Sequence, residues 1–324
     1  MRPGLLLYCQ HSVGIGHLMR SLLLASKLAR RFRVVLLNGG PIPPGLDIPK
    51  DIEIVDLPPL GMPDGHELVS RDANFDLARA KALRRALVMD AFCRVAPTVL
   101  LIELFPFGRK KFAFELLPLL KAARRSTQTK PLVLCSLRDI LVAARPDQQH
   151  HDDRAAWLCR RYFDGIFVHA DPGLARLEES FKPRRSAGIP VYYTGLVART
   201  AAQSANAARD AHILVSAGGG LVGGPLLQAA LDAQDILWPM HGRRMRIVAG
   251  PFLPEDQWRA LCARAAGRGD VELVRSVPDL SAEMRTAAAS LSQCGYNTAM
   301  DILCARVPAR RTLKLSYSYL HIED

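Results

Sequence analysis

The sequence predicts an α/β protein of two domains, each built on a parallel sheet with helices on both faces. Short apolar runs alternate with amphipathic segments along most of the chain, which is the pattern of strands that helices connect in parallel sheets. The chain has 324 residues, more than one hydrophobic core usually organises. Glycine-rich turns follow three of the predicted strands, and such turns lie at the sheet edge where α/β proteins bind ligands.

The first predicted domain comprises residues 1–197 and has the strand and helix order of a Rossmann-like fold. Its predicted strands are short apolar runs bounded by turn residues. These strands are Leu5–Cys9, Arg33–Leu37, Ile52–Val55, Thr98–Ile102, Leu132–Cys135, Gly165–Val168 and Val191–Thr194. The predicted helices are His17–Arg31, Ala73–Val95, Lys110–Arg125, Arg154–Phe163 and Gly173–Phe181.

A second Rossmann-like domain is predicted over residues 211–309, after a linker at 198–210 that is rich in Ala, Ser and Asn. Its predicted strands are His212–Ser216, Met245–Val248 and Val271–Leu273, followed by the weakly apolar run Ala287–Leu291. Its predicted helices are Pro225–Leu237, Pro254–Ala265 and Asn297–Cys304. Residues 310–324 are basic and show no helical period, so we expect an atypical tail there.

Composition and charge restrict the classes of function. An apolar fraction of 49% excludes a disordered chain, and no apolar run approaches the length of a membrane span. The seven cysteines lack metal-ligand spacing, so we expect reduced thiols in the cytoplasm. A formal charge of +12 favours an anionic partner, such as a nucleotide sugar or an acidic membrane surface. The basic pairs are not interleaved with aromatic residues, and therefore no nucleic-acid partner is expected.

The segment Gln293–Asp301 carries the strongest functional signal. It opens a predicted helix after a weakly apolar run, so unpaired N–H groups and the positive end of the helix dipole meet at Gly295. Such a turn suits phosphate binding. Asn297 and Thr298 add side-chain donors, and Asp301, one turn further on the same face, can accept hydrogen bonds from a ribose. The alternative is the start of an ordinary amphipathic helix.

A second glycine cluster, Ser216–Gly224, lies between a predicted strand and a predicted helix of the same domain. The backbone N–H groups of Gly218, Gly219 and Gly220 are suited to cradle a diphosphate. The cluster lacks the Lys-Ser/Thr pair of a P-loop, which argues against an NTPase. A purely structural turn is the alternative.

The first domain has its own glycine turn after its first strand, with Gly14 and Gly16 preceding His17. Glycine permits the tight turn and the close approach of backbone to a ligand. A dinucleotide-binding fingerprint fails here, because Met19 stands at its third glycine position. The second strand also ends at Asn38 and two glycines instead of at an acidic residue.

The segment Gln293–Asp301 resembles the nucleotide-sugar signature of GT-B glycosyltransferases. Aligned without gaps, Gln293 stands at the family's His and Tyr296 at its Trp. Thr298 stands at its Ser and Asp301 at its Glu. The resemblance implies that these positions hold the diphosphate and the ribose of a sugar donor.

The glycine turn of the first domain carries a second resemblance. It is similar to the Gly-x-Gly-His turn of the family-28 enzymes, bacterial transferases that add N-acetylglucosamine to lipid-linked peptidoglycan precursors. It is also similar to plant-type glycosyltransferases, in which a His after the first strand is the catalytic base. The resemblance implies that role for His17, and an imidazole suits a base that takes the proton of an acceptor hydroxyl. A helix-start residue bonded to backbone is the alternative, and His11 is the alternative base.

The resemblance implies two domains that face each other across a cleft, the GT-B arrangement. The donor-binding residues are then Gly218, Gly219, Gly220, Gln293, Gly295, Asn297, Thr298 and Asp301. Glu103 and Arg109 follow a strand of the first domain at the ligand edge. Together with Gly14 and Gly16 they are expected on the acceptor side, although ordinary surface ion pairs are the alternative for Glu103 and Arg109.

We therefore predict a hexosyl- or N-acetylhexosaminyltransferase that moves a sugar from a nucleotide-diphosphate donor, most simply a UDP sugar, to an acceptor hydroxyl. The acceptor stays open between a lipid-linked molecule, a glycan and a small molecule. No cofactor and no metal are expected, because the chain has no Asp-x-Asp motif and the family holds the diphosphate with helix dipoles and side chains. The protein is expected in the cytoplasm, and contact of its basic surface with the inner membrane face stays open.

The family continues after the position of Ala309 with an apolar strand, a sugar-binding turn and closing helices, which residues 310–324 do not resemble. We therefore expect a truncated end and an incomplete second domain. Two alternative functions stay open. One is a nucleotide-sugar 2-epimerase, which shares the fold, and the other is a non-catalytic nucleotide-binding remnant.

Overall fold

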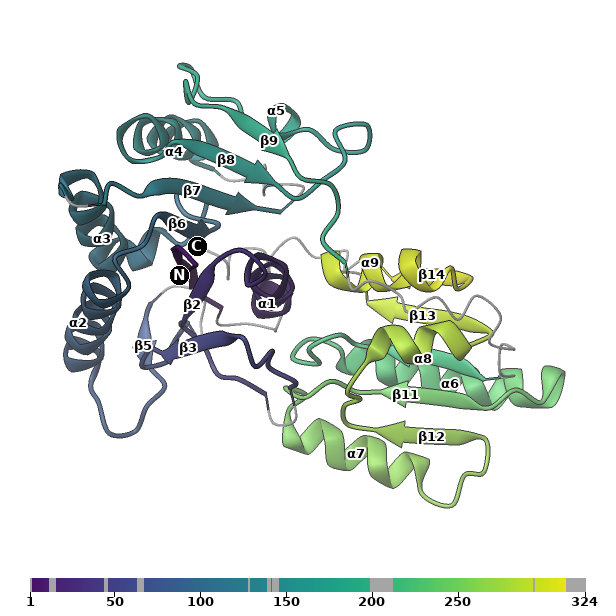
Figure 1. The fold of residues 1–324 in the computed structure, drawn as a ribbon. Helices are drawn as coiled ribbons and strands as arrows, with labels where there is room; N and C mark the ends of the chain where they lie inside the picture. Colours follow the sequence, from purple (N-terminus) through teal and green to yellow (C-terminus); the bar gives the residue numbers. More distant parts are fainter. Residues whose placement is uncertain are drawn as a thin grey trace.

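The structure is a computed structural model of the chain, and it describes two α/β units (Figure 1). The described residues are 2–11, 16–43, 46–62, 67–127, 129–138, 141, 146–198, 212–293 and 295–312. Each unit is built on a parallel sheet, so the predicted fold class of two parallel α/β domains is confirmed.

The first unit contains a seven-stranded parallel sheet with the order β3-β2-β1-β6-β7-β8-β9. Its strands are β1 (Gly4–Cys9), β2 (Arg33–Asn38), β3 (Ile52–Asp56), β6 (Val99–Glu103), β7 (Leu132–Leu137), β8 (Gly165–Val168) and β9 (Val191–Tyr193). The chain runs outwards from β1 to β3 and then returns to the other side of β1 as β6. Connections leave β1 and β6 in opposite directions, and ligands of open α/β sheets bind at such a point.

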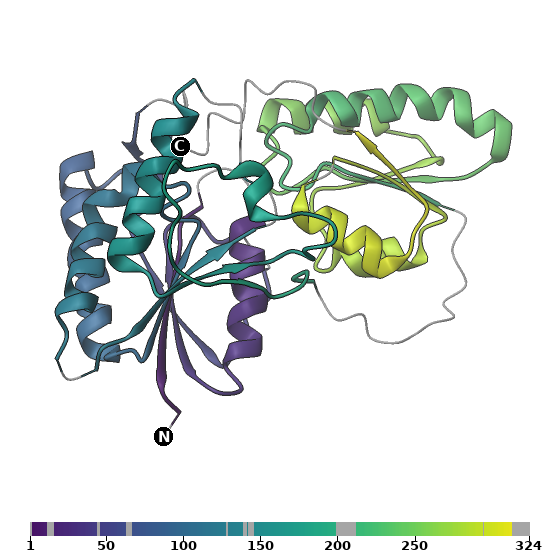
Figure 2. The ribbon, with the colours of Figure 1, turned by 90° about the horizontal axis from the view of Figure 1, so that it is seen from above.

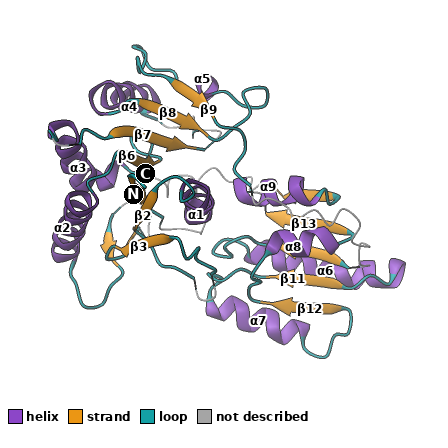
Figure 3. Ribbon diagram, viewed as in Figure 1, coloured by secondary structure: helices purple, strands orange, loops and turns teal. Residues whose placement is uncertain are grey.

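Helices cover both faces of this sheet (Figures 2 and 3). They are α1 (Gly16–Leu28), α2 (Leu77–Val95), η1 (Lys110–Phe112), α3 (Ala113–Arg125), α4 (Gln148–Tyr162) and α5 (Leu177–Ser180). Alternate residues of β1 point to opposite faces, as strand geometry requires. Leu6 and Tyr8 join the core with α2, α3 and α4, whereas Leu5 and Leu7 join the core with α1. Both faces of β1 are therefore buried, which explains its continuous apolar run.

The second unit has a five-stranded parallel sheet with the order β12-β11-β10-β13-β14. Its strands are β10 (Ile213–Ser216), β11 (Met245–Val248), β12 (Val271–Val274), β13 (Ala289–Gln293) and β14 (Ala309–Thr312). Its helices are α6 (Gly224–His241), α7 (Glu255–Ala265), α8 (Leu280–Thr286) and α9 (Tyr296–Ala305). The helices α6 and α7 cover one face, and α8 and α9 cover the other (Figure 2). Among the described helices of the chain, none is long and apolar enough to cross a membrane.

Some elements differ from the prediction. The helix predicted over Gly173–Phe181 is reduced to the four residues of α5, because Asp171 forms a turn instead. Its side chain accepts a hydrogen bond from the backbone N–H of Gly173 at 2.8 Å, a local bond that competes with helix formation. Helix α8 and the short hairpin of β4 (Leu60–Gly61) and β5 (Val69–Ser70) were not predicted.

The expectation for the end of the chain is wrong for its first residues. We expect an atypical tail at 310–324 that leaves the second domain incomplete, but Ala309–Thr312 form β14, which pairs with β13 in parallel. An edge strand is held by backbone hydrogen bonds and tolerates basic side chains, so the absence of an apolar run was not decisive. Residues 313–324 lie outside the described residues, as does most of the predicted linker at 198–210.

Candidate functional site

The helix starts of the two glycosyltransferase-like motifs, at Gly16 and at Tyr296, lie in contact where the two units meet. Helix α1 starts at Gly16 and α9 starts at Tyr296, and these two helices touch each other (Figure 1). The side-chain amide of Asn297 donates a hydrogen bond to the carbonyl oxygen of Gly16 at 2.9 Å. Residues 281 positions apart in the sequence are therefore joined at this point.

His17 is held by a carboxylate from the neighbouring strand. Its Nδ1 lies 2.7 Å from Oε1 of Glu103, and the two residues are 7% and 1% exposed. Because β1 and β6 are paired, the helix start after β1 and the last residue of β6 meet at the same sheet edge. When Nδ1 carries the proton toward Glu103, Nε2 of the neutral ring is the basic nitrogen.

Arg20 binds the same carboxylate one turn later in α1. Its Nη2 donates a hydrogen bond to Oε1 of Glu103 at 2.5 Å. The 3.3 Å approach of this Nη2 to Nδ1 of His17 is a contact between two donors when Nδ1 is protonated. The Arg20 guanidinium also lies 5.5 Å from the ring centroid of Tyr296, so it reaches from the carboxylate of the first unit to the second unit.

Glu103 is an ionised carboxylate in this setting. Burial alone raises the pKa of its carboxyl group, but the charge and hydrogen bond of His17 and the charges of Arg20 and Arg109 outweigh burial and lower the pKa to about 2. Glu103 therefore stays an acceptor throughout the neutral range and can hold His17 in one orientation. The sequence reasoning placed Glu103 on the acceptor side, but it missed this pairing with His17.

His11 was the alternative base, and its ring has a different environment. The residue is 1% exposed, and its Nε2 lies 3.1 Å from Oδ1 of Asn38 at the end of β2. A Cβ added at Gly40 would lie 2.8 Å from its Nδ1. This tight packing gives His11 the surroundings of a structural residue.

Tyr296 anchors the start of α9 to the first unit. Its hydroxyl donates to the carbonyl oxygen of His169 at 2.9 Å and accepts from the backbone N–H of Val197 at 3.0 Å. The His169 ring lies 2.8 Å from Oγ of Ser136 and 2.7 Å from Oγ1 of Thr194. Burial and the charge of Arg20 lower the pKa of His169 to about 3, so this ring is neutral. Sequence reasoning did not identify His169.

The glycine turn of the second unit has a partly structural role. Gly218 and Gly220 have φ angles of +61° and +90°. The N–H of Gly218 donates to Oγ of Ser216 at 3.2 Å, and that of Gly220 donates to the carbonyl of Ala217 at 3.1 Å. Two of the predicted donors to a diphosphate are thus already used within the turn. The carbonyl oxygen of Gly219 accepts a hydrogen bond at 2.9 Å from the backbone N–H of Phe252, in the turn after β11.

The start of α9 offers more open backbone. Gly295 is its N-cap residue and makes no side-chain cap bond, and an added Cβ there would meet nothing within 4 Å. Gln293 ends β13, and β13 pairs with β10, so this turn and the Gly218–Gly220 turn share a sheet edge. Thr298 is only 7% exposed, whereas Asp301 is half-buried one turn after Asn297.

Solved structures with the same arrangement include UGT2 of Phytolacca americana with UDP-2fluoro-glucose and pterostilbene. That structure is 16% identical, with a TM-score of 0.59 over 99% of this chain and 82% of the other. This chain has the GT-B fold. The calicheamicin glycosyltransferase CalG4 is 17% identical, with a TM-score of 0.55 over 95% and 79% of the two chains. MurG of Acinetobacter baumannii is 14% identical, with a TM-score of 0.54 over 98% and 82%. No protein-family model matches the chain, and no curated protein matches it by sequence.

The GT-B arrangement brings four of the predicted residues, His17, Glu103, Gly16 and Asn297, to the junction of the units. His17, Glu103 and Gly16 lie on the first-domain side, opposite the helix that begins with Tyr296 and Asn297. Gly14 lies outside the described residues. In the described part of the chain, no group of three or more His, Cys, Asp or Glu side chains is placed to hold a metal ion.

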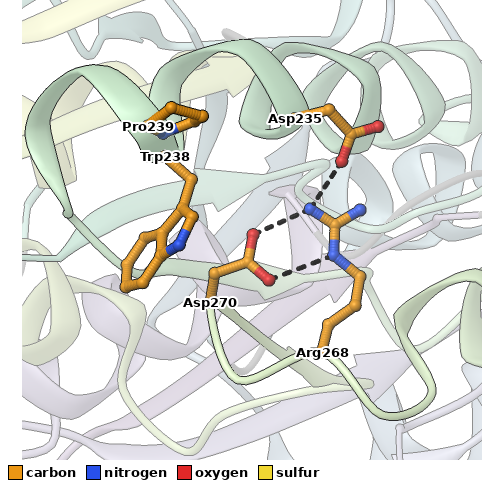
Figure 4. Close-up of a pocket in the computed structure, with 5 residues that line it drawn as sticks. All are labelled: Asp235, Trp238, Pro239, Arg268 and Asp270. Carbon is orange, nitrogen blue, oxygen red and sulfur yellow. Dashed lines mark hydrogen bonds and ion pairs between the residues drawn. The ribbon is translucent and has the colours of Figure 1, made fainter.

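One pocket of the GT-B fold lies away from this junction (Figure 4). Asp235, Trp238 and Pro239 come from the second half of α6, and Arg268 and Asp270 come from the turn before β12. This is the amino edge of the second sheet, opposite the carboxyl edge that carries the motifs. The Arg268 guanidinium is paired with Asp235 at 2.8 Å and Asp270 at 2.7 Å, so both carboxylates of the pocket already have a partner within the protein.

Proposed function

We propose that this chain is a glycosyltransferase that moves a sugar from a UDP-type donor to an acceptor hydroxyl. The observation that carries the proposal is the His17–Glu103 pair, which lies beside the start of α9 in a GT-B fold. Two solved structures with this fold support the choice of donor, since UGT2 contains UDP-2fluoro-glucose and another, TcCGT1, contains UDP.

His17 would act as the general base. The acceptor oxygen attacks the anomeric carbon of the sugar while Nε2 of His17 takes the hydroxyl proton. The bond from that carbon to the diphosphate oxygen breaks, and its electron pair leaves with UDP. Glu103 stabilises the imidazolium that forms, because it is already ionised and bonded to Nδ1.

The donor would bind at the carboxyl edge of the second sheet. The N-terminus of α9 at Gly295 would turn the positive end of the helix dipole toward the diphosphate. The Gly218–Gly220 turn and Gln293 lie on the same edge, and Asp301 would accept hydrogen bonds from the ribose. Helix dipoles can balance part of the diphosphate charge, which agrees with a reaction that uses no metal or cofactor.

The sugar would be a hexose or an N-acetylhexosamine, and the acceptor a molecule with an accessible hydroxyl. The net charge of +12 would also suit a protein that meets its acceptor at an acidic membrane surface from the cytoplasmic side.

The proposal is tested with a donor screen followed by a transfer assay. We expect calorimetry to show that UDP and UDP sugars bind more tightly than the GDP and TDP equivalents. We also expect a panel of phenolic and sugar acceptors to yield a glycoside together with free UDP. An epimerised nucleotide sugar without glycoside would identify an epimerase, and nucleotide binding without any product would identify a non-catalytic protein. Either result would overturn the proposal.

A further inference from the structure

The Arg109 side chain is buried, and none of the described residues binds its guanidinium. It is 2% exposed, and its Nε is buried without a hydrogen-bond partner. Within the part of the chain that the structure describes, its guanidinium makes no hydrogen bond and no ion pair. A buried guanidinium without an anion is unfavourable, and buried polar groups in folded proteins are almost always bonded. Such a group calls for a ligand that supplies the missing anion.

The charges around Arg109 do not cancel. Glu103 lies close enough for the charge of Arg109 to stabilise its carboxylate, but Oε1 of Glu103 is already bound by His17 and Arg20. Its Oε2 is buried without a hydrogen-bond partner among the described residues. The two guanidinium groups of Arg20 and Arg109 face the single carboxylate of Glu103, so at least one positive charge at this buried position is not balanced.

The backbone holds Arg109 in a fixed place. The loop after β6 begins with Leu104 and ends with Arg109, which have φ angles of +65° and +60°, a left-handed conformation that non-glycine residues rarely adopt. The N–H of Leu104 donates to the carbonyl of Ser136 at 2.8 Å. Phe105 and Phe107 are buried in the core of the first unit. A strained but well-anchored loop is typical of functional positions.

We propose that Arg109 binds an oxyanion, a carboxylate or a phosphate, that the acceptor carries beside its reacting hydroxyl. The inference rests on the proposed function and names the class of acceptor. Arg109 lies in the loop that follows β6, the strand that ends with Glu103. An anion bound there would lie on the acceptor side, close to the His17–Glu103 pair. Folding has already removed water from this guanidinium, so an anion that binds it does not have to displace that water. The anion therefore binds more tightly here than it would to an exposed arginine.

The first test compares acceptors that differ only in charge. Hydroxybenzoates are paired with the hydroxybenzamides of the same substitution pattern, and kcat/KM is measured for the native enzyme, Arg109→Gln and Arg109→Lys. We expect the native enzyme to favour the carboxylates by about tenfold or more. Arg109→Gln should remove this preference, so that kcat/KM falls by about tenfold more for the carboxylates than for the matching amides, and Arg109→Lys should retain part of the preference.

Arg154→Gln is the matched control, because Arg154 is an exposed arginine on α4 and its loss removes the same charge. Arg154→Gln should change kcat/KM for neither the carboxylates nor the amides. If Arg109→Gln instead lowers kcat/KM equally for carboxylates and amides, Arg109 only supports the ionised state of Glu103 and the proposal is wrong.

A binding measurement separates this inference from the proposed function. Calorimetry of hydroxybenzoate and hydroxybenzamide in the presence of UDP needs no turnover. The native protein should bind the carboxylate more tightly, and Arg109→Gln should lose that difference while its UDP affinity stays unchanged. A chain that binds carboxylates in this way but transfers no sugar would contradict only the proposed function. A tenfold loss of UDP affinity in Arg109→Gln, with equal binding of the two acceptor classes, would assign the anion to the donor and overturn the inference.

Discussion

On the first-domain side of the candidate site, His17, Arg20 and Glu103 are ionisable side chains that are almost fully buried and bonded to one another. On the second-domain side, Gly218 and Gly295 present backbone with open space where a side chain would be. The first side is thus assembled from side chains whose charges and orientations are set before any ligand arrives, whereas the second side is assembled from helix starts and empty space.

The difference matches the demands of the proposed reaction. Proton transfer needs one base in one orientation with a stable counter-charge, which buried bonded groups provide. A diphosphate needs room for its oxygens and several N–H donors, which glycine at a helix start provides. Substitutions on the first side should therefore act on rate and on pH dependence, and those on the second side on folding and on donor affinity.

The largest effect is expected for His17→Ala. Loss of the base should lower the transfer rate by about a hundredfold or more while donor affinity is retained. His11→Gln is the matched control, since His11 bonds Asn38 rather than Glu103, and it should stay within a few-fold of the native rate. Single-turnover kinetics and calorimetry measure the two quantities. A native rate in His17→Ala would remove His17 from the mechanism.

Glu103→Gln should change the acid stability of the protein. The pKa of Glu103 in the fold is about 2, below its ordinary 4.5, so folding favours the ionised form. The stability that Glu103 contributes is complete above about pH 4.5 and is lost as pH falls toward 2. It is on the order of 3 kcal/mol.

Urea unfolding of the native protein and Glu103→Gln across pH 2–6 measures this term. The free energy of unfolding of the native protein should fall more steeply below pH 4.5 than that of the variant. Parallel pH profiles for the two proteins would show that Glu103 is not held ionised by its neighbours.

Gly220→Ala and Gly218→Ala separate the structural part of the glycine turn from its open part. A Cβ at Gly220 would lie 2.7 Å from the carbonyl oxygen of Ala249, whereas a Cβ at Gly218 would meet nothing within 4 Å. Both have positive φ, so alanine is strained at either position, but only Gly220→Ala adds a clash with backbone. We expect Gly220→Ala to destabilise the fold by about 2–4 kcal/mol and Gly218→Ala by about 1 kcal/mol. Chemical denaturation compares them, and equal losses would contradict the assignment.

Asp301→Ala tests the donor site itself. If Asp301 accepts hydrogen bonds from the ribose, its loss should weaken UDP binding by about 1–3 kcal/mol with the fold intact. Calorimetry with UDP and uracil separates the contribution of the ribose diphosphate from that of the base. Unchanged UDP affinity would take Asp301 out of the site.

Local pattern was enough to predict most of the strands and most of the helices. The apolar run of β1 is a strand whose two faces are buried, and α9 starts directly after Gly295, its N-cap residue. These features depend on residues next to each other in the chain. In contrast, β14 was missed because an edge strand can form with Ala309 and Arg310 and needs no apolar run.

Two parallel α/β units and the motifs at their sheet edges follow from local pattern, because apolar runs, glycine turns and helix starts are made by neighbouring residues. Which of these motifs meet depends on how the strands are ordered and how the units pack. Glu103 pairs with His17, 86 positions away, because β6 returns to the side of β1. Tyr296 reaches His169 and Asn297 reaches Gly16 because the two units dock at the starts of α1 and α9. Arg109 is likewise an ordinary loop residue in the sequence, and only burial without a partner distinguishes it.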